Sequence, residues 1–190
     1  MDFEAARRAM IDSQLRPEGV TDGAVLAAMG SVAREDYVPA AARDFAYFDR
    51  PILLAEGHAM MPPAALGRLL GALAPRAGER ALVVGAASEY SAAILGAVGL
   101  EVISTDALDG GDAAGEAFDL ILIDGAVEAI AQGLVDRLAD GGRLGAALRS
   151  VGVSRLVVGR AAAGRLALRT IADADVPSLP HDARREAFTF

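Results

Sequence analysis

The chain has 190 residues, of which 53% are hydrophobic and 5% aromatic, and its 26 acidic residues outnumber the 18 basic ones to give a charge of −8. This acidity argues against a nucleic-acid partner, which needs a basic face, and the lack of cysteine excludes disulfides and thiolate metal sites. Because the sequence has no targeting signal and no apolar run of about 18 residues, we expect a single cytoplasmic domain with no membrane or metal partner.

The first 74 residues predict a helical N-terminal cap. Residues 2–15 have helical periodicity, with Asp2 as the cap and Pro17 closing the segment. A second short helix is predicted to begin at Thr21 or Asp22 and to end at Gly30; its apolar side comprises Val25, Leu26, Ala28 and Met29.

Residues 32–50 hold most of the aromatic side chains, namely Tyr37, Phe45, Tyr47 and Phe48. The interpretation that we favour is that these rings anchor the N-terminal cap to the following sheet domain. The alternative is that they line a substrate groove.

Residues 51–73 predict a short strand or turn, a loop around His58, a Met-Met-Pro-Pro corner and a helix with Pro63 in its first turn. This helix has Leu66, Leu69, Leu70 and Leu73 on one side. A histidine can act as a general base, but His58 has no partner nearby in the sequence, so a surface or capping role is favoured. The other histidine, His181, lies in a polar tail, which leaves a histidine metal site unsupported.

Residues 81–95 have the pattern strand, small-residue loop, helix. In a doubly wound sheet the first such junction is where a nucleotide-like ligand binds, because the loop backbone approaches the ligand and the helix N-terminus offers free N–H groups. Such loops usually carry several glycines, whereas this one has Gly85 alone, followed by Ala86, Ala87 and, after Ser88, Glu89.

A second strand is predicted over residues 100–105, followed by Asp106. An acid at this point can hold ribose hydroxyls, although an aspartate is equally common as the first residue of a turn. The linker 107–117 extends at most about 36 Å, which is enough to return along a strand but not to hold a further helix and strand. One strand-helix unit is therefore predicted to be missing.

The remaining residues predict more of the sheet. The apolar run 118–124 is typical of a buried central strand, and residues 125–138 have a helical apolar set of Val127, Ile130, Leu134, Val135 and Leu138. Residues 140–142 predict a turn into a strand at 143–148. Residues 154–160 and 165–171 predict a hairpin, and residues 187–190 a last short strand.

With these stretches in view, the chain resembles the protein-L-isoaspartate O-methyltransferases over nearly its whole length. The similarity is carried by residues 11–29, 32–49, 57–63, 75–95 and 118–144. It implies an α/β, Rossmann-like S-adenosylmethionine methyltransferase fold, here lacking one strand-helix unit, with a helical N-terminal cap and a C-terminal antiparallel hairpin. We expect one domain over 1–190, with a cap and substrate-groove region (1–74) and a Rossmann-like core (75–190).

The resemblance also implies site residues, and the chain departs from the family's pattern at several of them. Met61 occupies the position of a Ser or Thr in the corner motif, so no catalytic residue is predicted. The family's first cofactor motif has an acid and three glycines, where this chain has Val83, Gly85, Ala87 and Glu89. The cofactor-binding residues implied for S-adenosylmethionine are Gly85, Ala87, Ser88 and Asp106. Whether residues 100–106 match the family's second or third strand is left open.

The function that the resemblance implies is methyl transfer from S-adenosylmethionine to the isoaspartyl carboxyl of damaged proteins or peptides, with impaired activity and weak cofactor binding. The alternative is a non-catalytic pseudo-methyltransferase that acts as a binding or scaffolding protein. Binding of another small ligand ranks third, and the sequence permits a homo-oligomer.

Overall fold

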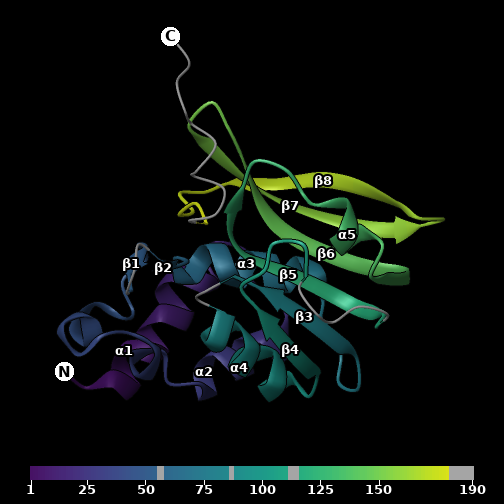
Figure 1. The fold of residues 1–190 in the computed structure, drawn as a ribbon. Coiled ribbons are helices and arrows are strands. Elements are labelled where there is room, and N and C mark those ends of the chain that lie inside the picture. Colours follow the sequence, from purple (N-terminus) through teal and green to yellow (C-terminus); the bar gives the residue numbers. More distant parts are fainter. Residues whose placement is uncertain (55–57, 86–87, 111–115, 180–190) are drawn as a thin grey trace, which may run out of the picture.

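The sheet is built around β3 (Arg80–Val84) and β5 (Phe118–Val127), two apolar strands that pair in parallel. In the computed structural model, which describes residues 1–54, 58–85, 88–110 and 116–179, the strand order is β4-β3-β5-β6-β7-β8 (Figure 1). The other strands are β4 (Glu101–Thr105), β6 (Leu138–Ser150), β7 (Val153–Ala162) and β8 (Arg165–Asp173). β4, β3, β5 and β6 are parallel, whereas β7 and β8 continue the sheet in antiparallel pairs.

Helices cover one face of this sheet (Figure 1). They are α1 (Phe3–Met10), which continues into a π-helical turn over Ile11–Leu15, α2 (Gly23–Ser31), α3 (Pro63–Leu73) and α4 (Ser88–Val98). As predicted, Asp2 caps α1 by accepting from the Ala5 N–H at 3.0 Å. Asp22, one of the two predicted caps, accepts from the N–H groups of Ala24 and Val25 and so caps α2. This helix ends one residue beyond Gly30.

Short elements connect α2 to α3. They are two 3₁₀ turns, Arg34–Tyr37 and Ala40–Phe45, and an antiparallel pair formed by β1 (Ile52–Leu53) and β2 (Ala59–Met60). Pro63 lies in the first turn of α3, as expected for a residue without a backbone N–H. The four leucines predicted to share a side of α3 are all buried.

The helix predicted over residues 125–138 is wrong. β5 continues to Val127, because Ala126 and Val127 pair with Ala147 and Leu148 of β6. Only one helical turn follows, α5 (Gln132–Val135), which covers the second face of the sheet together with residues of the same apolar set. Long-range strand pairing has here overridden a local helical spacing.

The predicted turn at residues 140–142 and strand at 143–148 lie within one long strand, β6. Its pairing with β5 is irregular between Phe118 and Leu120, and Gly141 takes a φ of +76°. The predicted hairpin is confirmed as β7 and β8, which turn at Ala163 and Gly164. The predicted strand at 187–190 and His181 lie outside the described residues.

The connection from β4 to β5 agrees with a missing strand-helix unit. β4 pairs with β3 on one side, and β5 pairs with β3 on the other. The described part of the connection, residues 106–110 and 116–117, contains a turn and no helix. Because β4 lies directly beside β3, residues 101–105 take the place of the second strand of a doubly wound sheet.

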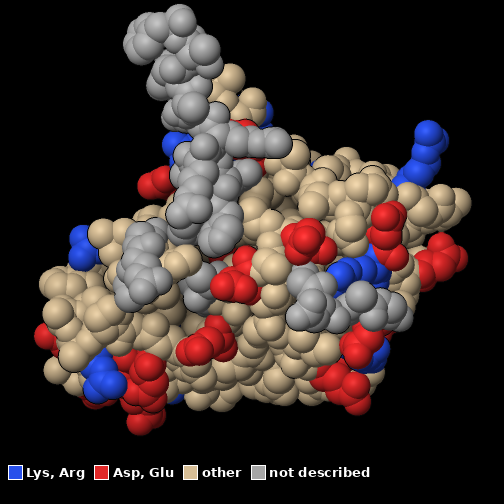
Figure 2. All heavy atoms as spheres, viewed as in Figure 1, with Lys and Arg blue, Asp and Glu red and all other residues tan. Residues whose placement is uncertain are grey.

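Acidic side chains are more numerous than basic ones on the face shown in Figure 2, and they form separate groups rather than one continuous field. This agrees with the charge of −8. Among the described residues, no helix is both long and apolar enough to cross a membrane.

Candidate functional site

The chain reverses its winding direction between β3 and β5. It leaves β3 towards β4 on one side and then returns to form β5 on the other side. In open α/β sheets, ligands bind in the crevice outside the carboxyl ends of the strands at such a switch point. The residues that follow β3 and those near the end of β5 therefore form the candidate site.

Gly85 lies at this point, as the sequence predicted. Its N–H donates to the carbonyl of Thr105 at 2.8 Å, which ties the end of β3 to β4. Its φ is +138°, and a β-carbon there would lie 3.0 Å from the carbonyl oxygen of Asp124. Only glycine therefore fits easily in this conformation and in this space.

The other predicted cofactor residues lie around Gly85. Ser88 begins α4 and is buried, and its N–H donates to the Gly85 carbonyl at 3.1 Å. Asp106 follows β4, is exposed, and makes no hydrogen bond or ion pair with the described residues. Ala87 lies outside the described residues. Glu89 lies in the first turn of α4, and its side chain is exposed to solvent.

Asp124 joins the candidate site, although no pattern in the sequence singles it out as a site residue. It is 1% exposed, and its Oδ2 accepts from Ser91 Oγ at 2.6 Å, while its Oδ1 has no hydrogen-bond partner among the described residues. Burial raises the pKa of the Asp124 carboxyl to about 6, against the opposing effects of the Ser91 hydrogen bond and the Arg34 charge. The only sequence signal was an aspartate at the end of an apolar run.

Arg34 is wholly buried and connects the N-terminal cap to the corner before α3. Its Nε donates to the Ala46 carbonyl at 2.7 Å, and its Nη2 donates to the Met61 carbonyl at 2.5 Å. Its guanidinium lies 4.9 Å from the centre of the Tyr90 ring. Burial lowers the pKa of Arg34, although Tyr90 and Asp124 oppose this shift. Within the part of the chain that the structure describes, neither Arg34 Nη1 nor the Tyr90 hydroxyl has a hydrogen-bond partner.

Met61 uses its backbone rather than its side chain at this corner. The side chain is fully buried in the core on the helical face of the sheet, and the carbonyl accepts from Arg34. A thioether is at most a weak hydrogen-bond acceptor. The corner therefore offers no hydroxyl at position 61, and the absence of a catalytic residue there stays a prediction.

One of the four aromatic residues of the 32–50 segment, Tyr37, packs against the sheet domain as the favoured interpretation predicts, whereas Tyr47, among the described residues, bonds only to residues within the cap. Tyr47 is buried and bonds to Glu35 and, at 2.8 Å, to Arg7; burial raises its pKa to about 12. The Tyr37 ring packs 5.5 Å from that of Tyr90 in α4.

The other two rings of that segment are surface residues. Phe45 and Phe48 are 42% and 47% exposed, and Arg50 lies over both rings. They therefore contribute little to anchoring the cap.

The chain's own C-terminal segment closes the switch point. Leu179 donates its N–H to the Ala126 carbonyl at 2.9 Å, and Ala126 donates to the Pro177 carbonyl at 2.8 Å. The Leu179 side chain is 6% exposed and lies so close to Gly125 that a β-carbon at that position would be 2.4 Å from Leu179 Cδ2. A β-carbon at Gly85 would be 3.4 Å from the same atom. Leu179 therefore fills the space between the two strand ends.

A family model and curated relatives that match the chain carry the same family name. The family model for protein-L-isoaspartate(D-aspartate) O-methyltransferase matches residues 5–109. Two curated relatives carry the name protein-L-isoaspartate O-methyltransferase. The one from Methylorubrum populi is 37% identical over 74% of this chain and 78% of its own length. The one from Koribacter versatilis is 32% identical over 86% of both chains.

Solved structures show the same fold. A protein-L-isoaspartate O-methyltransferase structure superposes with a TM-score of 0.75, at 15% identity, over 90% of this chain and 65% of the other. A putative enzyme of the same name from Plasmodium falciparum, in complex with S-adenosyl-L-homocysteine, superposes with a TM-score of 0.72, at 17% identity, over 94% and 98%.

Proposed function

Because the chain belongs to the protein-L-isoaspartate(D-aspartate) O-methyltransferase family, we propose that it transfers the methyl group of S-adenosylmethionine to the isoaspartyl carboxyl of damaged proteins, at a low rate. The observation that carries this proposal is the alignment with relatives of that name over 74% to 86% of the chain. The switch-point crevice at Gly85 supports it, because that is where a nucleotide-like ligand binds in this class of sheet.

The residues at the crevice fit S-adenosylmethionine only in part. Asp106 is exposed and unpaired among the described residues, so its carboxylate is free to accept from ribose hydroxyls. Val83, however, is an apolar core residue, and Leu179 occupies the space beside Gly85 and Gly125. We infer that residues 176–179 must move before the cofactor can enter the space beside Gly85 and Gly125.

The corner before α3 also supports a low rate. Accurate orientation of two reacting groups supplies roughly 7–11 kcal/mol of barrier reduction. Met61 presents only a buried apolar side chain and a carbonyl already bonded to Arg34. The corner therefore has one hydroxyl fewer to hold a substrate carboxylate than the family's pattern implies.

One observation favours the alternative, a non-catalytic pseudo-methyltransferase that binds a partner. It is the contact of Leu179 with Gly125, which closes the crevice with the chain's own residues. A titration calorimetry experiment with S-adenosylmethionine separates the two functions. Micromolar binding supports the methyltransferase, whereas no binding by either the native chain or a Leu179→Ala variant supports the alternative.

A cytoplasmic location and a homo-oligomeric state remain predictions made from the sequence. Cell fractionation tests the first, and light scattering of the purified chain tests the second.

A further inference from the structure

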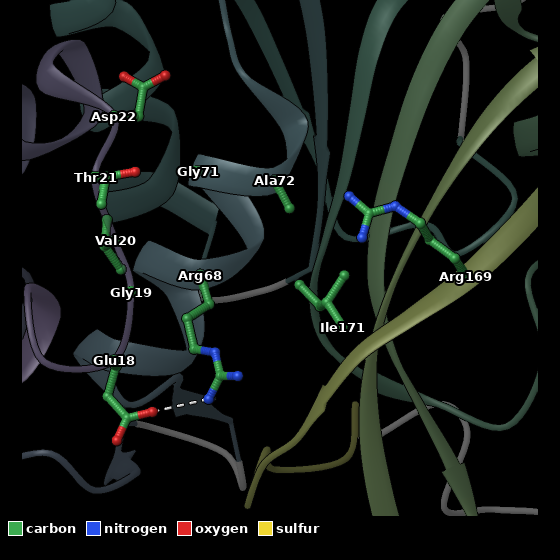
Figure 3. Close-up of a pocket in the computed structure, with 10 residues that line it drawn as sticks. All are labelled: Glu18, Gly19, Val20, Thr21, Asp22, Arg68, Gly71, Ala72, Arg169 and Ile171. Atoms are coloured by element: carbon green, nitrogen blue, oxygen red, sulfur yellow. Dashed lines mark hydrogen bonds and ion pairs between the residues drawn. The ribbon is translucent and has the colours of Figure 1, made fainter.

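A groove runs along α3 on the side that faces β8. It consists of three adjoining hollows of about 280, 430 and 430 Å³. Glu18 and Arg68 border both the first and the second hollow, while Ala72 and Arg169 border both the second and the third. Figure 3 shows the middle hollow, where Arg169 and Ile171 extend from β8 towards α3.

The groove exists because α3 covers β6 and β7 but leaves the face of β8 open. Arg143 of β6 donates from its Nε to the Leu73 carbonyl at the end of α3, at 2.8 Å. A β-carbon at Gly145 of β6 would lie 2.8 Å from Leu73 Cδ1, so the helix rests closely on this strand. Within the described residues β8 pairs only with β7, and the helix presents the small residues Gly71 and Ala72 to the middle hollow.

One end of the groove carries two positive charges without a counter-charge. Arg160 and Arg169 are exposed, and neither makes a hydrogen bond or ion pair with the described residues. Arg160 of β7 lies opposite Ala167 of β8, and Ala167 is two residues from Arg169 along β8. The side chains of Arg160 and Arg169 are therefore diagonal neighbours on one face of the sheet. Arg143, opposite Arg160, is neutralised by Glu79 at 2.6 Å.

The other end of the groove carries charges of both signs. Asp175 and Arg50 border the first hollow and are exposed, and neither makes an ion pair with the described residues. Between the two ends, Ile171 and Ala72 provide an apolar section. The free charges therefore favour an occupant with carboxylates at the Arg160 end and an apolar middle.

The length of the groove favours an extended chain. The residues of β8 and its continuation that border it run from 167 to 175, which at about 3.3 Å per residue is roughly 27 Å. A helix of the same number of residues would span only about 13 Å. A small anion would occupy the Arg160 end and leave the other two hollows without a ligand.

We propose that the groove between α3 and β8 binds an extended segment of another protein whose acidic side chains pair with Arg160 and Arg169. In an extended segment the side chains of residues i and i+2 lie on one face, about 7 Å apart. This matches the spacing of roughly 7–8 Å between diagonal neighbours on adjacent strands. The segment therefore carries two acids separated by one residue, and the inference does not depend on methyl transfer.

The test uses fluorescence anisotropy with a labelled, terminally blocked peptide of about nine residues that has two glutamates, separated by one residue, at one end and valines in the middle. The expected result is binding to the native chain that weakens as salt is added, because the arginines are exposed. An Arg160→Gln/Arg169→Gln variant should bind the peptide about tenfold more weakly. Both arginines are exposed, so the variant should keep the native circular dichroism spectrum.

Two controls make the test decisive. The variant Arg8→Gln/Arg165→Gln removes the same charge at exposed positions that border none of the three hollows, and it should bind like the native chain. The second control is a peptide with glutamine in place of glutamate, which should not bind. Equal loss in both variants, equal binding of the glutamine peptide, or displacement by inorganic phosphate as effective as by unlabelled peptide would overturn the proposal.

Discussion

Leu179 and Gly125 are in such close contact that a β-carbon at position 125 would lie 2.4 Å from Leu179 Cδ2. The contact joins the C-terminal segment to the end of the central strand, and the backbone hydrogen bond from Leu179 to Ala126 holds it in place. Since a ligand of this fold would bind at the same point, cofactor binding and the position of Leu179 should be linked.

The first prediction concerns this link. Leu179→Ala should increase the affinity for S-adenosyl-L-homocysteine by about tenfold, because less apolar surface must leave the crevice when the ligand enters. Titration calorimetry measures the affinity. Leu53→Ala is the control, since Leu53 is 74% exposed. Equal affinities of the native chain and the Leu179 variant would show that this side chain does not limit binding.

The second prediction tests the same contact from the other side. Gly125 has a φ of +157° and no room for a β-carbon, so Gly125→Ala should lower the free energy of unfolding by about 1–3 kcal/mol. Adding Leu179→Ala should make the loss from Gly125→Ala smaller, because the collision is removed. Urea unfolding of the four proteins measures the coupling. Strictly additive losses would mean that the two residues do not interact.

The sequence predicted the strands better than the contacts between distant residues. The apolar runs at 81–84 and 118–124 correctly indicated two buried strands, because burial on both faces leaves a continuous apolar signature. Residues 125–138 were misread, since apolar residues with helical spacing also occur where a strand continues into a short turn. The approach of Leu179 to Gly125 depends on the folded path of 53 intervening positions, which no local pattern contains.

The third prediction concerns pH. The pKa of Asp124 is about 6, above its ordinary value of 3.8, so the folded state binds this proton more tightly than the unfolded state. Its contribution to stability should therefore fall as pH rises from about 4 to 6, by roughly 3 kcal/mol in all, and stay at the lower level above that.

Asp124→Asn should remove this fall, and Ser91→Ala should enlarge it by removing the hydrogen bond that favours the ionised carboxylate. Urea unfolding of the three proteins between pH 4 and pH 8 gives the comparison. If the free energy of unfolding of the native chain and of the Asp124→Asn variant changed with pH in parallel, the stability change would not come from Asp124.

The fourth prediction concerns Arg34. Arg34→Ala leaves the carbonyls of Ala46 and Met61 without their buried donor and opens a cavity, so it should cost about 3 kcal/mol or more in the free energy of unfolding. Arg43→Ala, at a half-exposed arginine with a 3.7 Å ion pair to Asp36, should change the stability by no more than about 0.5 kcal/mol. Thermal or urea unfolding measures the stability of both variants. Similar losses in the free energy of unfolding would mean that Arg34 does not hold the cap.

The sequence marked position 61 only as a departure from the family's corner motif. The sequence showed a methionine in place of a hydroxyl residue, but not that the Met61 carbonyl accepts from Arg34 or that the side chain fills the core. Asp124 and Ser91 lie in separate elements, 33 residues apart, so their hydrogen bond was equally invisible. Both relationships arise from packing between elements rather than from local sequence.

The most direct test of the account is a methyl-transfer assay with labelled S-adenosylmethionine, an isoaspartyl peptide and the matched aspartyl peptide. We expect slow, base-labile methylation of the isoaspartyl peptide alone, at least about a hundredfold below a family member with the complete motifs. We also expect a faster rate for Leu179→Ala, and a further gain when Met61→Ser is added. Absence of methylation by the native chain and by both variants, at saturating cofactor, would contradict the proposed function. Native turnover as fast as that of a complete family member would contradict the inferred effects of Leu179 and Met61.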